Sequence, residues 1–150
     1  MQIIRLCYPE FECWKRDISQ FIKGSVLANF KNSRIPEDYF DSKSAELKNY
    51  LKNKSAILFF AVEEKVLGMA WCHEIMRFDK RRLHIAHIAV LDECQGQGVG
   101  SALLKKVEKY AMENGYSGID LMVSADASQA VGFYKKNNFE IERFLMKRDF

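Results

Sequence analysis

Three of the chain's eight glycines fall within five residues, at Gly96, Gly98 and Gly100. They lie between an apolar segment that ends at Val90 and an amphipathic segment that begins at Val99. Glycine lets backbone N–H groups approach a ligand closely, and the N-terminus of a following helix adds roughly half a positive charge at the same point. The spacing therefore predicts a turn that binds phosphate or pyrophosphate, although such turns also occur where the chain only changes direction.

Two common phosphate-binding motifs do not match this turn. A Walker loop, GxxxxGK[ST], has a lysine directly after its last glycine, and here Ser101 follows Gly100. The dinucleotide-binding fingerprint is GxGxxG, whereas these glycines are spaced GxGxG. A dinucleotide-binding chain also normally opens with its glycine turn, whereas this turn follows the third strand of an expected meander. A nucleotide-binding regulatory domain therefore remains only as an alternative.

Hydrophobic periodicity predicts the elements that position the turn. Apolar residues recur at three- and four-residue steps in four segments, which predicts helices over 10–23, 42–53, 99–114 and 128–137. Apolar runs with turn residues between them predict strands over 1–6, 55–62, 67–76, 83–90, 119–124 and from 139 onward. The composition of 24–40 favours a loop, with one helical turn as the alternative. Strand–helix–strand units require parallel strands, so the prediction is a mixed α/β fold: an antiparallel meander first and parallel β-α-β units later.

Composition limits the class of protein. A length of 150 residues predicts one domain over 1–150, and an apolar content of 48% excludes disorder. The net charge of +3 arises from 23 basic and 20 acidic residues mixed along the chain, which does not indicate a nucleic-acid binder. The longest apolar run, 56–62, is too short to cross a membrane. Four cysteines and three histidines show no disulfide or metal-ligand spacing, so we expect a cytoplasmic protein with free thiols and no metal.

The turn and its surroundings resemble a known family. The sequence Gln95-x-x-Gly98-x-Gly100, preceded by an apolar strand and followed by Leu103-Leu104, is similar to motif A of the GNAT superfamily of N-acetyltransferases. Downstream, Ala130-x-x-x-Tyr134-x-Lys136-x-x-Phe139 resembles the closing motif of that family. The expected order of strands and helices also agrees over nearly the whole chain.

The resemblance implies a GNAT-like fold in which two parallel strands splay apart and acetyl-CoA binds in the cleft. The pantetheine arm would pair with the strand before the turn, and the diphosphate would bind to amides of the turn. On this model the cofactor-binding residues are Ile88, Ala89, Val90, Gln95, Gly96, Gln97, Gly98, Val99, Gly100, Ser101, Ser128, Phe133 and Tyr134. Ala127 and Gln97 depart from the family pattern, because asparagine and a basic residue are frequent at these two positions.

The resemblance also implies catalytic roles. An amine attacks the thioester, the Ile88 amide stabilises the oxyanion, and Tyr134 donates a proton to the leaving thiolate. The proton of the amine needs an acceptor, for which His84, His87 and Glu74 compete. Unless a bulge intervenes, His84 shares its strand face with Ile88, so we expect His84 to be the base.

The expected function is therefore transfer of the acetyl group of acetyl-CoA to a primary amine of a small molecule or a peptide. The alternative is a non-catalytic module that binds or senses acyl-CoA. A third alternative, a thiol enzyme built on Cys94 and a histidine, lacks an oxyanion site. We expect no nucleic-acid or membrane partner. The chain has room for one long final strand or two short ones, and a missing last strand would leave an edge where a homodimer could pair.

Overall fold

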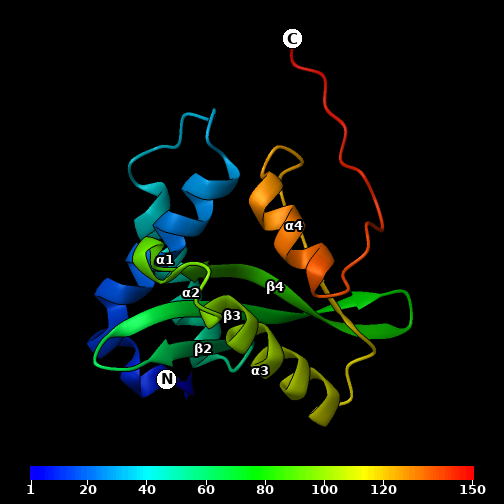
Figure 1. Ribbon diagram of the computed structural model, residues 1–150. Helices are drawn as coiled ribbons and strands as arrows, with labels where there is room; N and C mark the ends of the chain where they lie inside the picture. The colour runs from blue at the N-terminus through cyan, green and yellow to red at the C-terminus, as the bar shows by residue number, and fades with distance from the viewer.

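The computed structural model covers residues 1–150 and contains one five-stranded sheet with helices on both faces (Figure 1). The strands, in their order across the sheet, are β1 (Gln2–Leu6), β2 (Ala56–Val62), β3 (Val66–Arg77), β4 (Lys80–Val90) and β5 (Ile119–Leu121). The helices are α1 (Phe11–Asn29), α2 (Tyr39–Lys52), α3 (Val99–Glu113) and α4 (Ser128–Lys136), with 3-10 turns η1 (Tyr8–Glu10) and η2 (Asp92–Cys94).

The sheet is mixed, as the sequence predicts. Strands β1 to β4 pair antiparallel, and β5 pairs parallel to β4 after the crossover through α3. The β4–β5 pairing covers only Leu83–Ile85 against Ile119–Leu121. Beyond Ile85, β4 continues to Val90 with no strand on that side, so the two parallel strands splay apart.

Two apolar layers hold the helices to the sheet. Successive side chains of β2 point alternately into one layer and the other, because neighbouring residues of a strand face opposite sides of the sheet. Leu58 and Phe60 pack with α1 and α2, whereas Ile57 and Phe59 pack with α3. The sheet is therefore covered on both faces, which fixes the edge of β4 between α1 on one side and α3 with α4 on the other.

A bulge in β4 changes which residues share a face. Trp71 of β3 pairs with His87, but the next residue, Cys72, pairs with Ile85, so Ala86 is an extra residue in β4. An extra residue reverses the alternation from that point on. His84 and His87 therefore face the α1 side together, and the expectation that His84 shares a face with Ile88 is wrong.

Several predicted boundaries also differ. Helix α1 extends into the first part of the expected loop and ends at Asn29. Ser25 and Val26 are buried against the sheet, and this packing offsets the cost of a glycine in a helix. Strand β5 ends at Leu121 rather than near residue 124. The final strand expected from residue 139 is absent: Phe144, Leu145 and Met146 are exposed, and an unpaired strand is not stable by itself.

Gly68 of β3 offers a test of how closely α3 packs on the sheet. A Cβ atom at this position would lie 2.9 Å from the backbone oxygen of Ala89 and 3.0 Å from a methyl group of Leu103. We expect Gly68→Ala to lower the free energy of unfolding by about 1–3 kcal/mol through overpacking. Gly132→Ala is the matched control, because a Cβ there meets nothing within 4 Å; urea unfolding that gave equal stability for both variants would contradict this packing.

Candidate active site

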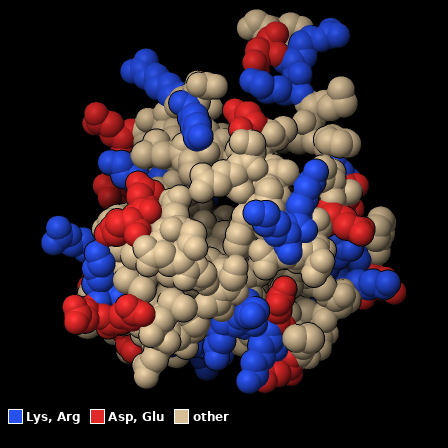
Figure 2. All heavy atoms as spheres, viewed as in Figure 1, with Lys and Arg blue, Asp and Glu red and all other residues tan.

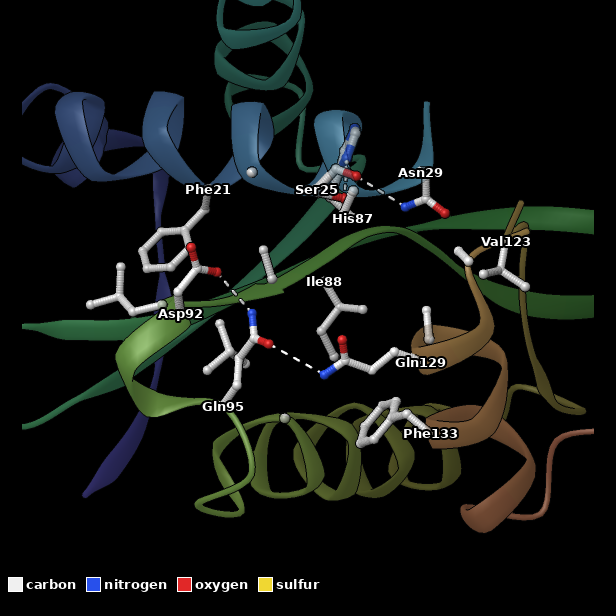
Figure 3. A pocket seen from close by; sticks show the side chains of 18 of the residues that line it. Phe21, Ser25, Asn29, His87, Ile88, Asp92, Gln95, Val123, Gln129 and Phe133 are labelled. Carbon is white, nitrogen blue, oxygen red and sulfur yellow. Dashed lines mark hydrogen bonds between the residues drawn. The ribbon is translucent and has the colours of Figure 1, made fainter. Parts of the chain in front are cut away.

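The splay of β4 and β5 opens into a cavity of about 710 Å³. The free half of β4 forms its floor, the glycine turn and α4 form one wall, and the C-terminal half of α1 forms the other (Figure 3). In the space-filling view the hollow near the centre of the face is bounded mainly by residues other than Lys, Arg, Asp and Glu (Figure 2). The cavity therefore has an open strand edge, a helix N-terminus and largely uncharged walls.

The glycine turn presents unpaired backbone donors to this cavity. Gly96 and Gly98 have φ angles of 75° and 85°, a region that L side chains rarely adopt. The backbone N–H groups with no backbone acceptor in this segment are those of Gly96, Gly98, Val99, Gly100 and Ser101. Several free donors at one helix N-terminus are a suitable site for an anion, so the turn fits a diphosphate.

The cavity lining at the turn contains no Lys or Arg, and the nearby Lys65 is paired with Glu93. The two acidic side chains at this end are each held by a partner: Gln95 Nε2 donates to Asp92 at 2.9 Å, and Lys65 pairs with Glu93 at 2.8 Å. Gln95 also accepts a longer hydrogen bond of 3.4 Å from Gln129 of α4 (Figure 3). The backbone and the helix dipole, rather than side-chain charge, are therefore what this site offers to a phosphate.

Most of the predicted cofactor-binding residues lie together. The ones that line the cavity are Ile88, Ala89, Val90, Gln95, Gly96, Gly98, Gly100, Ser101, Ser128, Phe133 and Tyr134. Gln97 and Val99 do not line it: Gln97 is exposed and bonds to the Glu93 carbonyl, and the Val99 side chain is buried under α3. Their backbone N–H groups belong to the turn, but their side chains have no part in the cavity.

Tyr134 lies on α4 with its ring between two aromatic neighbours. Its centroid is 5.2 Å from that of Phe133 and 5.5 Å from that of Phe139, both edge-on. Burial raises the pKa of the Tyr134 hydroxyl well above its usual range, so the group keeps its proton at neutral pH. A cavity-lining hydroxyl that stays protonated can donate a hydrogen bond to an anion that forms in the cavity.

The two candidate histidines occupy different environments. His84 does not line the cavity, and its Nδ1 atom lies 2.6 Å from a carboxylate oxygen of Asp120, which Arg77 and Arg82 also contact. His87 does line the cavity, and its Nδ1 atom is hydrogen-bonded to the Ser25 hydroxyl at 3.1 Å (Figure 3). The other candidate, Glu74, is exposed and bonded to Arg81.

Burial makes His87 a weak base. Loss of hydration lowers the pKa of its imidazole to about 4, and the positive charge of Lys43 acts in the same direction. The ring is therefore neutral at neutral pH. It can hydrogen-bond a substrate, but it takes a proton from an ammonium group only at a considerable cost in free energy.

This depressed pKa predicts a loss of stability in mild acid. The unfolded chain binds a proton at residue 87 below about pH 6.5, whereas the folded chain does so only near pH 4, so stability falls as the pH falls through this window. Between pH 7 and 5.5 we expect His87 alone to remove about 1 kcal/mol. Urea unfolding at the two pH values measures this, and His87→Gln, which can still bond Ser25, should reduce the difference. An unchanged difference would contradict the shift.

Residues at the end of α1 were not predicted to belong to the site. Ser25 and Asn29 line the cavity because α1 runs six residues further than its periodicity indicates. Asn29 also bonds to the segment after β5: its side-chain oxygen accepts from the Ser124 N–H at 3.3 Å, and its carbonyl accepts from the Ser124 hydroxyl. The sequence gives little sign of this extension, because Gly24 and Asn29 indicate a loop locally. The helix is extended by the burial of Ser25 and Val26 against the sheet.

Two other kinds of feature are not found in the chain. No three His, Cys, Asp or Glu side chains come together as a metal site requires. None of the helices combines the length and the apolar character that a membrane span needs. All four cysteines are free thiols, of which Cys7 and Cys13 are exposed.

With this geometry established, comparison with known proteins assigns the family. The family model described as "Acetyltransferase (GNAT) family" matches residues 25–139. The chain therefore belongs to the GNAT family, and it is an acetyltransferase by that membership; the predicted GNAT-like fold class is confirmed.

Individual relatives are distant. An uncharacterized N-acetyltransferase from Archaeoglobus fulgidus is 26% identical over 128 residues, covering 80% of this chain and 84% of that protein. Human N-acetyltransferase 8B is 31% identical over 96 residues, but these cover 62% of this chain and only 42% of that protein. A solved structure from Clostridium acetobutylicum, described as a predicted acetyltransferase with acetyl-CoA, superposes with a TM-score of 0.79 at 15% identity, covering 98% and 95% of the two chains.

Proposed function

We propose that the chain transfers the acetyl group of acetyl-CoA to the primary amine of a small molecule or a peptide. The observation that carries this proposal is the turn at Gly96–Ser101, whose free N–H groups face the same cavity as the open edge of β4. This combination suits a ligand with a diphosphate at one end and an amide-containing arm at the other. Coenzyme A has both features.

Each part of the ligand has its own position in the proposal. The diphosphate accepts hydrogen bonds from the turn amides, as anions do at helix N-termini. The pantetheine amides pair with Ile88, Ala89 and Val90, where β4 has no neighbouring strand on the β5 side. Phe133 and Ser128 of α4 cover the arm from the other wall. The thioester then lies beside Tyr134.

The chemical step is direct attack of a neutral amine on the thioester carbonyl. The Ile88 N–H donates to the developing oxyanion, and the Tyr134 hydroxyl donates its proton to the departing thiolate. The raised pKa of Tyr134 means that the hydroxyl carries a proton when the thiolate leaves, but it also makes the hydroxyl a weaker acid than an ordinary phenol. The amide forms as the C–S bond breaks, and the departing thiolate takes the Tyr134 proton. The attacking nitrogen loses its extra proton to solvent, and the Tyr134 phenolate is reprotonated from solvent.

The amine must lose its proton before it attacks. An amine with a pKa near 10 costs about 4 kcal/mol to deprotonate at pH 7. His84 is outside the cavity and bonded to Asp120, so it is not assigned as the base. Because the pKa of His87 is lowered to about 4, the proton passes to solvent, and His87 with Ser25 orients the neutral amine.

Release of free thiol from acetyl-CoA in the presence of amines, amino acids, polyamines and peptides tests this function. We expect thiol release that depends on one class of amine and an acetylated product one acetyl group heavier by mass spectrometry. With that amine, kcat/KM should rise with pH toward the pKa of the amine and show no inflection near 6.5. Binding of acetyl-CoA without transfer to any amine would instead support a non-catalytic acyl-CoA-binding module.

Three further proposals concern the context of the enzyme. We propose that residues 1–150 form one catalytic domain, supported by the cavity that draws on α1, β4 and α4 together. We also propose that the protein is located in the cytoplasm, because exposed free thiols such as Cys7 and Cys13 are typical of a reducing compartment. The outer edge of β5 has no partner strand, which leaves a place for a second copy of the chain to pair as a homodimer.

A further inference from the structure

The two ends of the cavity differ in what they offer a ligand. Asp92 and Gln95 lie at the end formed by the glycine turn, whereas Ser25, Asn29 and Val123 lie at the other end (Figure 3). If coenzyme A occupies the turn and the edge of β4, as the proposed function requires, the second end receives the acceptor. The side chains at the second end then determine which chemical class of acceptor can bind, and this inference rests on the proposed function.

No acidic side chain lines the acceptor end. The only acidic residues in the whole cavity are Asp92 and Glu93, both at the turn. At the acceptor end the single formal charge is Lys31, two residues beyond the end of α1, and the rest of this wall is uncharged: Gly24, Ser25, Ala28, Asn29, Met122 and Val123. This end of the site is therefore net positive.

Two carboxylates close to the histidines of β4, outside the cavity wall, are already paired. Glu46 of α2 binds Lys43 at 2.6 Å and the Tyr50 hydroxyl at 2.9 Å. Asp120 contacts His84 at 2.6 Å and Arg82 at 3.6 Å. Neither carboxylate is left to bind the ammonium groups of a substrate.

A polycationic acceptor does not match such a site. After one amine has entered to react, its remaining ammonium groups would meet Lys31 and no carboxylate of the cavity lining, and like charges repel. A substrate that is both an amine and an anion fits better. Its amino group can lie near the C-terminal carbonyls of α1, which favour positive charge, while its anion lies near the Lys31 ammonium.

We propose that the acceptor is a small amine with a carboxylate beside its amino group, as in an α-amino acid, and that Lys31 binds the carboxylate. Lysine supplies a strong donor on a flexible stem, which suits a carboxylate at the mouth of the cavity. Lys31 is thus a specificity-determining residue, and it takes no part in the acetyl transfer itself.

Matched acceptors test this inference. Each of a panel of α-amino acids is compared with its own carboxamide and its decarboxylated amine, for example phenylalanine, phenylalaninamide and phenethylamine, at saturating acetyl-CoA. The kcat/KM values are referred to the unprotonated amine, since the three compounds differ in pKa. We expect at least one amino acid to exceed its carboxamide by tenfold or more.

Substitution of the lysine separates charge from fold. Lys31→Met should lower kcat/KM for the amino acid at least tenfold and leave that for the carboxamide within about twofold, and Lys31→Glu should reverse the preference. Lys15→Met, at an exposed lysine of α1 outside the cavity, is the control and should change neither. Thermal unfolding of each variant confirms that the fold is retained.

The outcomes are distinguishable. Equal or faster acetylation of carboxamides, simple amines or polyamines, with no response to either Lys31 substitution, overturns this inference and leaves the acetyltransferase function standing. If acetyl-CoA binds but no acceptor of any kind is acetylated, the proposed function falls and this inference with it.

Discussion

Gly98→Asp is expected to lower the affinity for coenzyme A at least 100-fold. Gly98 is the N-cap of α3 at the centre of the turn, and its N–H is one of the free donors. A carboxylate about 5 Å from a diphosphate charge costs about 3 kcal/mol for each unit charge at an effective dielectric constant of 20. This alone exceeds the free energy that corresponds to a 100-fold change. Isothermal titration with coenzyme A measures the loss.

Two controls separate charge from backbone strain. Gly98→Asn has the same shape as the aspartate variant and tolerates a positive φ, but it carries no charge, so most of the affinity should remain. Gly115→Asp places the same side chain at a φ of 71° beyond the other end of α3, and binding there should be unchanged. Equal losses in the Asn and Asp variants, or normal binding by Gly98→Asp, would contradict the role given to the turn.

Tyr134→Phe is expected to lower kcat by about 100-fold or more, with the dissociation constant for coenzyme A changed less than threefold. The phenylalanine keeps the ring between Phe133 and Phe139 and removes only the proton donor. General acid catalysis contributes about 10² to 10⁴ to the rate, and in the proposed mechanism Tyr134 supplies the proton to the departing thiolate. Steady-state kinetics together with titration measures the two quantities separately.

A second tyrosine provides the matched control. Tyr110 lies on α3, where its ring stacks under Arg5 at 5.1 Å and no hydrogen bond to its hydroxyl is formed. Tyr110→Phe should therefore leave kcat unchanged. A fully active Tyr134→Phe enzyme would mean that another group, or solvent, protonates the thiolate.

The sequence predicts most of the fold because its strongest signals are local. Helix α3 follows from its apolar periodicity and from glycines at both ends, and the meander β2–β4 follows from apolar runs separated by short turns. The end of α1 was not predicted, because Gly24 and Asn29 indicate a loop locally and only tertiary burial of Ser25 and Val26 overrides them. Residues 139–150 show the opposite case, a strand-like pattern without a partner strand.

The candidate site divides in the same way. The turn and Tyr134 were predicted because each belongs to a short sequence motif. Both line the same cavity in the structure. His84 was assigned to the wrong face, because a single extra residue at Ala86 reverses the strand alternation and leaves no trace in the hydrophobic pattern. The acceptor end of the cavity was not predicted, because it forms where the end of α1 contacts the segment after β5. These two segments are about 95 residues apart in the chain.

A crystal structure of the complex with coenzyme A tests the central claim most directly. It should show the diphosphate within hydrogen-bonding distance of the amides between Gln95 and Ser101, with the pantetheine arm along Ile88–Val90 and the sulfur facing the Tyr134 hydroxyl. Coenzyme A bound elsewhere on the chain, or a glycine turn that makes no contact with its phosphates, would contradict it.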